Sequence, residues 1–228
     1  MLFRSVLMSV YVKENPVFLE EAVESIIHQT LKPSEVVIVE DGPLTPELYQ
    51  VLEKLEAQSS IPIKRCPLEQ NRGLGLALQN GVLQCQYDVI ARMDTDDIAV
   101  EDRFEQQFEL MEKENLDLLG GHIAEFIDQP DEIVSYRRVP TKHEDIIVYQ
   151  RMRSAFNHMT VMFKKEMVLK AGNYEDGLYM EDDLLWLNMI SAGARTGNVD
   201  QILCKVRVGA GMFERRGGLR YLKLYRQA

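Results

Sequence analysis

Short apolar runs alternate with amphipathic stretches through residues 1–97, and this alternation restricts the fold more than any other feature of the sequence. Four runs are expected to be buried strands: residues 5–11, 35–39, 61–66 and 88–93. Three stretches place their apolar side chains on one helical stripe: residues 16–29, 46–57 and 73–83. Strands that alternate with helices are typical of a mostly parallel sheet. We therefore expect an α/β fold, with a mostly parallel central sheet and helices on both faces.

The pattern becomes mixed after residue 97. Helices are expected at residues 101–114, 145–153, 164–171 and 181–192. Strands are expected at residues 118–121 and 160–163, with a hairpin across residues 124–138 that turns at Gln129-Pro130-Asp131. The sequence contains no repeat, low-complexity tract or linker, so we expect a single domain over residues 1–228.

Composition excludes several kinds of protein. The hydrophobic content of 46% allows a sizeable core, and no apolar run approaches the roughly 20 residues of a membrane span. The apolar start ends at Lys13 without a small-residue cleavage site, so it is expected to be a strand and not a signal peptide. The cysteines fit neither a disulfide framework nor a zinc knuckle, which favours a reducing cytoplasm; they are Cys66, Cys85 and Cys204.

Charge is unevenly distributed along the chain. The formal net charge of −10 argues against nucleic acid as a partner. Residues 205–228 are basic, however, with Glu214 as their one acidic residue. Leucines and tyrosines lie between these basic residues, a combination that suits contact with anionic lipid head groups; a final helix packed on the core is the alternative. The basic residues are Lys205, Arg207, Arg215, Arg216, Arg220, Lys223 and Arg226.

Three carboxylates lie within four residues directly after the fourth predicted strand, at Asp94, Asp96 and Asp97. In open α/β sheets, ligands bind outside the carboxyl ends of the strands. Carboxylates this close repel one another unless a cation neutralises them, and an Asp-x-Asp pair suits Mn²⁺ or Mg²⁺ bound to substrate phosphates. We expect Asp94 and Asp96 to bind the metal. Capping of the next helix is the alternative explanation, and we assign it to Asp97 or Asp102.

Acidic residues also begin the last predicted helix, in the segment Met180-Glu181-Asp182-Asp183. Such residues favour the helix dipole, so ordinary capping would explain them. A carboxylate near a bound substrate can also act as a general base, which takes a proton from an attacking hydroxyl. Asn157-His158 directly precedes another predicted strand, where a histidine serves either the core or a site. The residues alone leave these alternatives open.

Polar residues also follow the first three predicted strands. Ser9 and Tyr11 end the first strand, and Glu40-Asp41 ends the second. The loop Asn71-Arg72-Gly73-Leu74-Gly75 follows the third strand, and its glycines suit an anion or a close backbone approach, with turn formation as the alternative. A turn does not require Arg72, which is able to reach a phosphate or a base.

Taken together, these segments resemble the family 2 glycosyltransferases, the large inverting group with the GT-A fold. Ser5 to about Trp186 carries the resemblance. Its EDGP segment, with Pro43 in place of the usual serine, is similar to a bacterial subgroup that builds O-antigen or capsule repeat units on lipid-linked diphosphate sugars. Four motifs occur in the family's order: SVLMSVYVKENPVFLEEAVESIIHQTLKPSEVVIVEDGP, NRGLGLALQNGV, MDTDD and MEDDLLWLNMI.

The resemblance implies a Rossmann-like GT-A domain that moves a hexose from a nucleotide sugar, expected to be a UDP-sugar, with inversion at the anomeric carbon. The acceptor would be a saccharide hydroxyl, free or lipid-linked. Asp94 and Asp96 would contact the ribose and a Mn²⁺ or Mg²⁺ ion, which acts as a Lewis acid on the departing diphosphate. Asp182 would be the general base, and Glu181 would position nearby groups. Contacts to the nucleoside are implied for Ser9, Tyr11, Asp41 and Arg72.

Two features remain open within this resemblance. Many family members carry two aspartates where this chain has Glu40-Asp41, so either acid could meet the base. Family members also usually continue further, so the chain is expected to be truncated. We expect a nucleotide-sugar-binding half at residues 1–97, an acceptor-binding half at residues 98–204 and a basic C-terminal segment at residues 205–228. The protein is expected in the cytoplasm, peripheral on the inner face of the plasma membrane.

Three other protein classes fit less well. A nucleotidyltransferase that makes nucleotide sugars favours a glycine-rich loop with a basic residue after the first strand, and Tyr11-Val12-Lys13-Glu14-Asn15 is not such a loop. A non-catalytic receiver-type signalling domain is about half as long and leaves the Glu181-Asp182 segment unexplained. A phosphatase of the Asp-x-Asp-x-Thr type is disfavoured because Ile98 occupies the threonine position.

Overall fold

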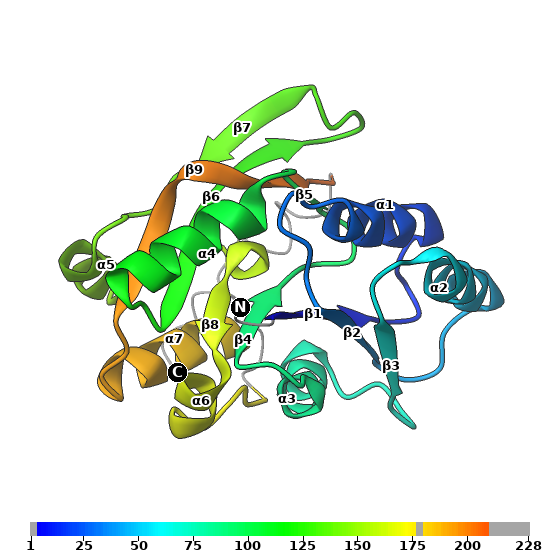
Figure 1. Ribbon diagram of the computed structural model, residues 1–228, viewed down its shortest axis with the longest axis horizontal. Coiled ribbons are helices and arrows are strands. Elements are labelled where there is room, and N and C mark those ends of the chain that lie inside the picture. Colours follow the sequence, from blue (N-terminus) through cyan, green and yellow to red (C-terminus); the bar gives the residue numbers. More distant parts are fainter. Residues whose placement is uncertain (1–3, 177–179, 210–228) are drawn as a thin grey trace, which may run out of the picture.

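The computed structural model describes residues 4–176 and 180–209, and its front half contains the predicted alternation of strands and helices (Figure 1). The strand order is β3-β2-β1-β4, and all three pairings are parallel. Every element predicted for this half is present, with bounds that differ by at most a few residues. The elements are β1 (Arg4–Val10), α1 (Pro16–Ile27), β2 (Glu35–Glu40), α2 (Pro46–Gln58), β3 (Ile63–Pro67), α3 (Leu74–Gln84) and β4 (Val89–Arg92).

The back half extends the same sheet with mixed pairing, as predicted. Strand β8 pairs antiparallel with β4 and with β6, so it joins the two halves, and the described residues form one nine-stranded sheet. The elements are β5 (Ile98–Ala99), α4 (Arg103–Glu114), β6 (Leu118–Phe126), β7 (Ile133–Arg137), α5 (His143–Gln150), η1 (His158–Thr160), β8 (Met162–Lys164), α6 (Lys165–Lys170), α7 (Glu181–Ser191) and β9 (Thr196–Arg207).

The predicted hairpin is present as β6 and β7, but one prediction for the back half was wrong and one strand was not predicted. Residues 118–121 and the start of the hairpin belong to one long strand, β6, which pairs with β7 beyond the turn. Strand β9 was missed altogether, although it pairs in parallel with all of β6. Its sequence, TGNVDQILCKVR, interrupts the apolar run with polar residues, and its register with β6 shifts near His122. Neither a continuous apolar run nor strict alternation therefore marked it as a strand.

The long strand β9 also corrects the expected start of the basic C-terminal segment. Lys205 and Arg207 lie in β9, where Lys205 pairs with Asp131 and Arg207 with Glu21. The other basic residues of that segment lie outside the described residues. Within residues 4–176 and 180–209, no helix has both the length and the apolar character needed to cross a bilayer.

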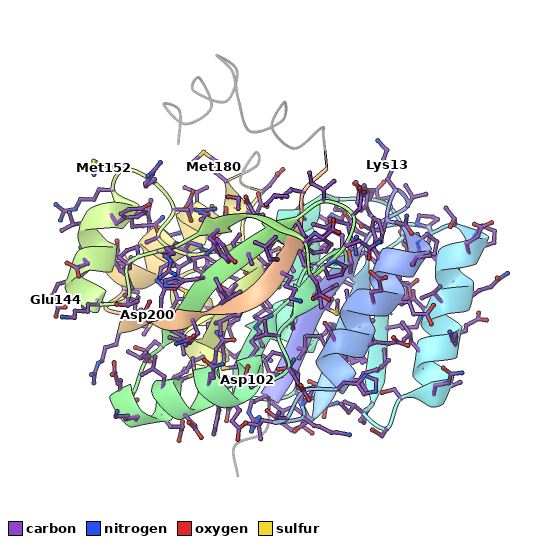
Figure 2. All side chains as sticks on the ribbon, turned by 90° about the horizontal axis from the view of Figure 1, so that it is seen from above. Lys13, Asp102, Glu144, Met152, Met180 and Asp200 are labelled. Atoms are coloured by element: carbon purple, nitrogen blue, oxygen red, sulfur yellow. The ribbon has the colours of Figure 1, made fainter. Side chains whose placement is uncertain are left out.

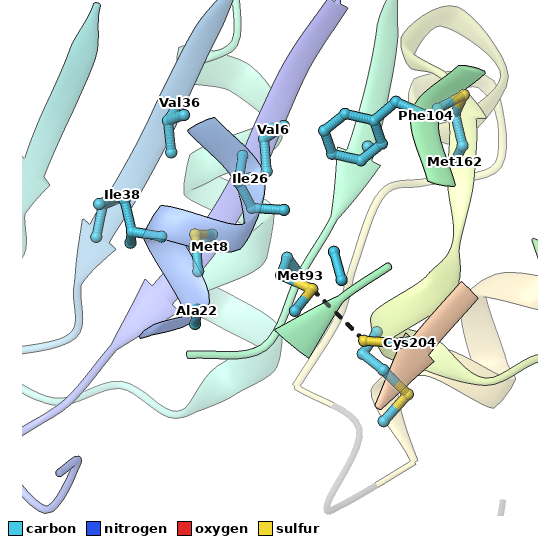
Figure 3. Close-up of a cluster of buried hydrophobic side chains, with 14 of the residues drawn as sticks. Val6, Met8, Ala22, Ile26, Val36, Ile38, Met93, Phe104, Met162 and Cys204 are labelled. Carbon is cyan, nitrogen blue, oxygen red and sulfur yellow. Dashed lines mark hydrogen bonds between the residues drawn. The ribbon is translucent and has the colours of Figure 1, made fainter. Parts of the chain in front are cut away.

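Strands β1, β2 and β4 are buried on both faces because helices cover both, whereas the edge strand β3 is mostly half-buried. In β1, Val6 and Met8 pack on the side of α1 and α2, while Leu7 packs on the side of α3. Gly81 lets α3 approach closely, since an added Cβ would lie 2.3 Å from a methyl carbon of Leu7. The cluster of buried side chains on the side of α1 and α2 also contains Met93 and Cys204, so the core is continuous from β1 to β9 (Figure 3).

The loops that join the parallel strands to the following helices lie at one edge of the sheet. Helices α1 and α2 begin in the same way, with a capping side chain before proline, Asn15 for α1 and Thr45 for α2. Lys13, which follows β1, and Met180, which precedes α7, lie at the same edge of the molecule, opposite Asp102 (Figure 2). The carboxyl ends of the parallel strands lie at the first of these edges, where ligands bind in such sheets.

Candidate active site

The carboxylates of Asp94, Asp96 and Asp97 gather directly after β4, with one oxygen from each lying within 4.8 Å of the others. The side chain of Asp94 is 30% exposed and forms a 2.5 Å ion pair with the buried Arg92. Burial, followed by the charge of Asp94, raises the pKa of Asp96 to about 6. Carboxylates that resist ionisation together are a suitable donor set for a divalent cation.

Asp97 differs from the other two aspartates. It is buried, and its Oδ1 accepts a 2.9 Å hydrogen bond from the backbone N–H of Arg207. Burial, followed by Asp94 and Asp96, raises its pKa well above the usual range. Helix α4 begins at Arg103, and its N-cap residue Asp102 makes no side-chain capping bond. The predicted capping role is therefore wrong for both Asp97 and Asp102, and Asp97 instead ties the acidic loop to β9.

Arg207 is a site residue that the sequence did not single out. Its Nη2 donates to Glu21 at 2.6 Å, and its Nε donates to the carbonyl of Asp96 at 3.3 Å. The guanidinium also lies over the rings of Phe18 and Phe126, at 3.7 and 4.6 Å from their centroids. The sequence predicts a place for Arg207 in the basic C-terminal segment, because no strand pattern marks β9. In the fold it joins α1, β6 and the acidic loop.

Asp41 holds the loop that follows β3. Its two carboxylate oxygens accept backbone hydrogen bonds from Arg72 at 2.7 Å and from Gly73 at 3.0 Å. Gly42 has a φ of +84°, and an added Cβ would lie 2.5 Å from the backbone nitrogen of Asn71. Only glycine fits that contact and that backbone conformation. The end of β2 and the Arg72 loop therefore meet, and the side chain of Arg72 is exposed.

Glu40 and Asp41 have different partners in the structure. Glu40 is buried and forms a 2.5 Å ion pair with Arg65 of β3. At the end of β1, the hydroxyl of Thr95 donates to the carbonyl of Ser9 at 3.5 Å, which links that strand end to the acidic loop. Tyr11 follows β1 and is half-buried. The predicted donor-site residues therefore all lie at the same sheet edge.

The first turn of α7 presents Glu181 and Asp182 beside this region. Glu181 lies against α3, since a Cβ added to Gly75 would be 3.1 Å from the Glu181 Cβ. The Asp182 side chain is 25% exposed, and burial, followed by the charges of Asp183 and Glu181, raises its pKa to about 7. Asp183 has a separate partner, because its Oδ1 accepts a 2.8 Å hydrogen bond from Gln150. Asp182 is thus the carboxyl of this turn best suited to exchange a proton near neutral pH.

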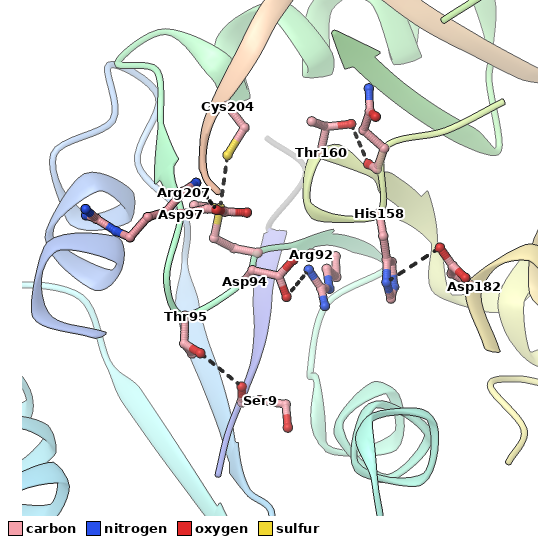
Figure 4. A network of polar contacts seen from close by, with 12 residues as sticks. Ser9, Arg92, Asp94, Thr95, Asp97, His158, Thr160, Asp182, Cys204 and Arg207 are labelled. Atoms are coloured by element: carbon pink, nitrogen blue, oxygen red, sulfur yellow. Dashed lines mark hydrogen bonds and ion pairs between the residues drawn. The ribbon is translucent and has the colours of Figure 1, made fainter. Parts of the chain in front are cut away.

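Arg92 and His158 lie between the two groups of acids. Figure 4 shows the Arg92 guanidinium between Asp94 and the ring of His158, with Asp182 on the far side of that ring. Burial, followed by the nearby Arg92, lowers the pKa of His158 well below its ordinary value, so the ring is neutral. The sequence left open whether His158 belongs to the core or to a site. The feature of the sequence that pointed to a site role was the position of His158 shortly before β8, a strand that pairs with β4.

Comparison with known proteins identifies the family and the fold of the chain. The model of the family described as Glycosyl transferase family 2 matches residues 5–171. An uncharacterized glycosyltransferase of Haemophilus influenzae is 46% identical, over 96% of this chain and 81% of its own length. A UDP-Gal:alpha-D-GlcNAc-diphosphoundecaprenol beta-1,3-galactosyltransferase of Escherichia coli is 38% identical, over 95% of this chain and 78% of its own length.

Solved structures show the fold. TarS residues 1–349 of S. aureus, in complex with UDP-GlcNAc, superimposes with a TM-score of 0.76 at 17% identity, over 99% of this chain and 65% of that chain. A mannosyltransferase of Pyrobaculum calidifontis, in complex with GDP-Man and Mn²⁺, superimposes with a TM-score of 0.71 at 15% identity, over 94% and 59%. These likenesses confirm the GT-A fold. The chain is therefore a glycosyltransferase that belongs to glycosyl transferase family 2.

Proposed function

We propose that this protein is a metal-dependent, inverting hexosyltransferase that uses a UDP-sugar and acts in bacterial polysaccharide biosynthesis. The observation that carries the proposal is the meeting of two acid groups at one sheet edge, one after β4 and one at the start of α7, with Arg92 between them. The first suits a metal and the second suits proton transfer. A metal-dependent sugar transfer with inversion uses both chemistries at one place.

The donor and acceptor classes follow from relatives. The E. coli relative is named for a UDP-galactose donor and a GlcNAc-diphosphoundecaprenol acceptor, and it aligns over 95% of this chain. The S. aureus TarS structure contains UDP-GlcNAc in the same fold. We extend both to this chain as a UDP-hexose donor and a saccharide acceptor linked to a lipid diphosphate.

Asp94 and Asp96 would hold the metal, for which Mn²⁺ or Mg²⁺ is suited. Both are partly exposed carboxylates, and the raised pKa of Asp96 means that its ionised form gains from a nearby cation. Asp97 is committed to the backbone of Arg207, so we do not assign it to the metal. When bound, the ion supplies a Lewis acid that stabilises charge on the leaving diphosphate.

Asp182 would be the general base. Its carboxylate takes the proton of the acceptor hydroxyl while that oxygen attacks the anomeric carbon of the sugar. The bond from the anomeric carbon to the diphosphate breaks as the new bond forms, and the electron pair leaves with the UDP. Attack from the face opposite the diphosphate inverts the anomeric configuration. Glu181 would position acceptor groups beside Asp182, from the helical turn that it shares with the base.

The nucleoside would bind over the ends of β1 and β2. Asp41 has both carboxylate oxygens on the backbone of the Arg72 loop, so its first role would be to hold that loop as one wall of the site. The exposed side chain of Arg72 would then reach the base or a phosphate. Ser9 and Tyr11 would form the floor. Glu40 is neutralised by Arg65, so we assign the contact with the base to Asp41.

The test begins with donor binding. Nucleotide sugars are screened for thermal stabilisation of the purified protein with Mn²⁺, Mg²⁺ or EDTA, and a UDP-sugar with metal should stabilise it most. Calorimetry then compares Asp94→Ala and Asp96→Ala with Asp102→Ala, which removes the same charge at the opposite edge (Figure 2). Binding should be lost in the first two variants and kept in the third. Equal metal-dependent binding in all three would remove the aspartates from the site.

A peripheral location at the inner face of the plasma membrane is part of the same proposal. The basic C-terminal segment that suggests it lies outside the described residues, so its support is the sequence alone. Co-sedimentation with vesicles tests it. Binding to vesicles of anionic lipid that weakens with added salt would support membrane contact through the basic segment, and no binding to anionic vesicles would argue against it.

A further inference from the structure

The ring of His158 has a defined contact on each of its two nitrogens. Its Nε2 lies 2.9 Å from the hydroxyl oxygen of Tyr174. Its Nδ1 lies 4.0 Å from Oδ2 of Asp182, a contact drawn in Figure 4. The edge of the ring packs against Trp186, with centroids 5.8 Å apart. Two contacts fix the plane of the ring and leave one nitrogen turned toward the carboxylate that we assign as the base.

Hydrogen bonds to neighbouring elements hold both Tyr174 and His158 in place. Tyr174 is anchored to α3, because Gln79 Nε2 donates to its carbonyl at 2.6 Å. Asn157, directly before His158, donates to the carbonyl of Gly121 in β6 at 2.8 Å. The Tyr174–His158 pair is therefore held by α3 and by β6, while Asp182 lies on a separate element, at the start of α7.

The hydrogen bonds decide which ring nitrogen carries the proton. His158 is neutral, so it carries a single N–H. Burial raises the pKa of Tyr174, which therefore keeps its O–H, and His158 Nε2 is the partner that the described residues offer this hydroxyl. If Tyr174 donates to Nε2, the ring proton lies on Nδ1. An ionised Asp182 favours the same tautomer, because the other would point a lone pair at the carboxylate.

We propose that His158 is a positioning residue, which directs its Nδ1–H at Asp182 and, with Tyr174 behind it, aims the carboxylate at the acceptor hydroxyl. This inference rests on the proposed role of Asp182 as the base. The distance of 4.0 Å exceeds that of a hydrogen bond. Contacts of this kind often shorten when substrate binds. One Asp182 oxygen would then be held by His158 and the other would be free to take the proton.

Two substitutions separate this role from simple packing. The amide of asparagine lies one bond beyond Cγ, as Nδ1 does, so His158→Asn keeps an N–H toward Asp182. The amide of glutamine lies at the position of Nε2, so His158→Gln keeps the Tyr174 contact and loses the donor to Asp182. Both variants lose the same ring contact with Trp186, and His158→Asn also leaves the buried Tyr174 hydroxyl without its partner. His158→Asn should therefore be the less stable of the two, and thermal unfolding of both variants checks that each still folds.

Transfer kinetics are measured for wild type, the two His158 variants and Asp182→Asn. His158→Gln should lower kcat roughly 10- to 100-fold, the worth of a hydrogen bond to a charged group, with the donor KM unchanged. His158→Asn should keep most of kcat. Equal losses in both variants, or a loss that appears in the donor KM, would overturn the positioning role. If the positioning role fails in this way but Asp182→Asn abolishes transfer, the proposed function still stands. If Asp182→Asn is fully active, both the role of Asp182 as the base and the positioning role of His158 are wrong.

The pH profile gives an independent readout. Arg92 from β4, Tyr174, and Glu181 and Asp183 on its own helix also face Asp182, and neither His158 variant changes them. Loss of the Nδ1–H disfavours the carboxylate, so His158→Gln should move the acidic limb of kcat to higher pH. His158→Asn should leave it in place. A limb that does not move in His158→Gln would contradict a donor at Asp182.

Discussion

The backbone N–H of Arg207 donates a 2.9 Å hydrogen bond to the buried carboxylate of Asp97. The two residues are 110 positions apart in the chain. Their bond joins β9, the last strand of the described residues, to the acidic loop that we assign to the metal. The geometry of that loop therefore depends on the completed sheet, and not only on the βα units that precede it.

We predict that Asp97 acts through this bond and not through its charge. Asp97→Asn keeps an acceptor for the Arg207 N–H and should keep stability within about 1 kcal/mol. Asp97→Ala leaves a buried donor without a partner and should cost about 1–3 kcal/mol. Denaturant unfolding measures both values. If the alanine and asparagine variants are equally stable, the bond to Arg207 does not hold the loop.

The Arg207 side chain should also contribute to stability through its packing between α1 and β6. Arg207→Gln loses the contacts with the Phe18 and Phe126 rings, as well as the ion pair with Glu21. We expect a cost of about 1–2 kcal/mol, mostly from the desolvated ring contacts. Glu21→Gln is the control, because Glu21 is 43% exposed and its ion pair alone should contribute little. An equal cost in both variants would assign the effect to the ion pair.

Donor affinity should depend on the contact of Asp41 with the Arg72 loop. Asp41→Ala removes two acceptors of charge-assisted hydrogen bonds and should raise the KM for the UDP-sugar by roughly tenfold or more. Glu40→Gln leaves the loop in place and should change that KM far less. Initial-rate kinetics at varied donor concentration check this. A larger effect from Glu40→Gln would show that Glu40 is the acid that matters.

Activity should rise with pH through the pKa of Asp182, because the base must be ionised. Burial, followed by Asp183 and Glu181, raises that pKa to about 7, so kcat should fall as the pH drops below about 7. Asp183→Asn removes the larger of the two negative neighbours and keeps an acceptor for Gln150. The acidic limb of the kcat profile should therefore move to lower pH in that variant. A limb that stays in place would argue against Asp182 as the titrating group.

Much of the fold could be predicted from the sequence, because burial on both faces leaves short, mostly apolar runs in β1, β2 and β4. Asp94 and Asp96 could also be placed at the ligand-binding edge of the sheet, because they follow a predicted strand. That Asp182, in the first turn of α7, lies beside them was implied only by the family resemblance. Strand β9 could not be predicted in this way. Its stability comes from pairing along the whole of β6, a long-range effect that leaves no local pattern.

The contacts around the acids could not be predicted either. Capping was a sound local explanation for Asp97, yet a partner from β9 prevailed because a buried acceptor must be satisfied. The sequence around His158 did not decide whether this histidine serves the core or a site. Its meaning depends on Tyr174, Asp182 and Arg92, which reach it from three other parts of the chain. The possible chemistry of single residues could thus be predicted from the sequence. The structure was needed to show which partner each residue contacts and therefore which role it has.

The central claim is that Asp94 and Asp96 hold a metal beside a sugar-transferring base. Its most direct test is sugar transfer from a UDP-hexose to a GlcNAc-diphospholipid by EDTA-treated protein, with NMR to assign the anomeric configuration of the product. We predict product only after Mn²⁺ or Mg²⁺ is restored, with configuration opposite to that of the donor, and none from Asp96→Ala. Equal transfer in EDTA, or a product that keeps the donor's configuration, would contradict the account.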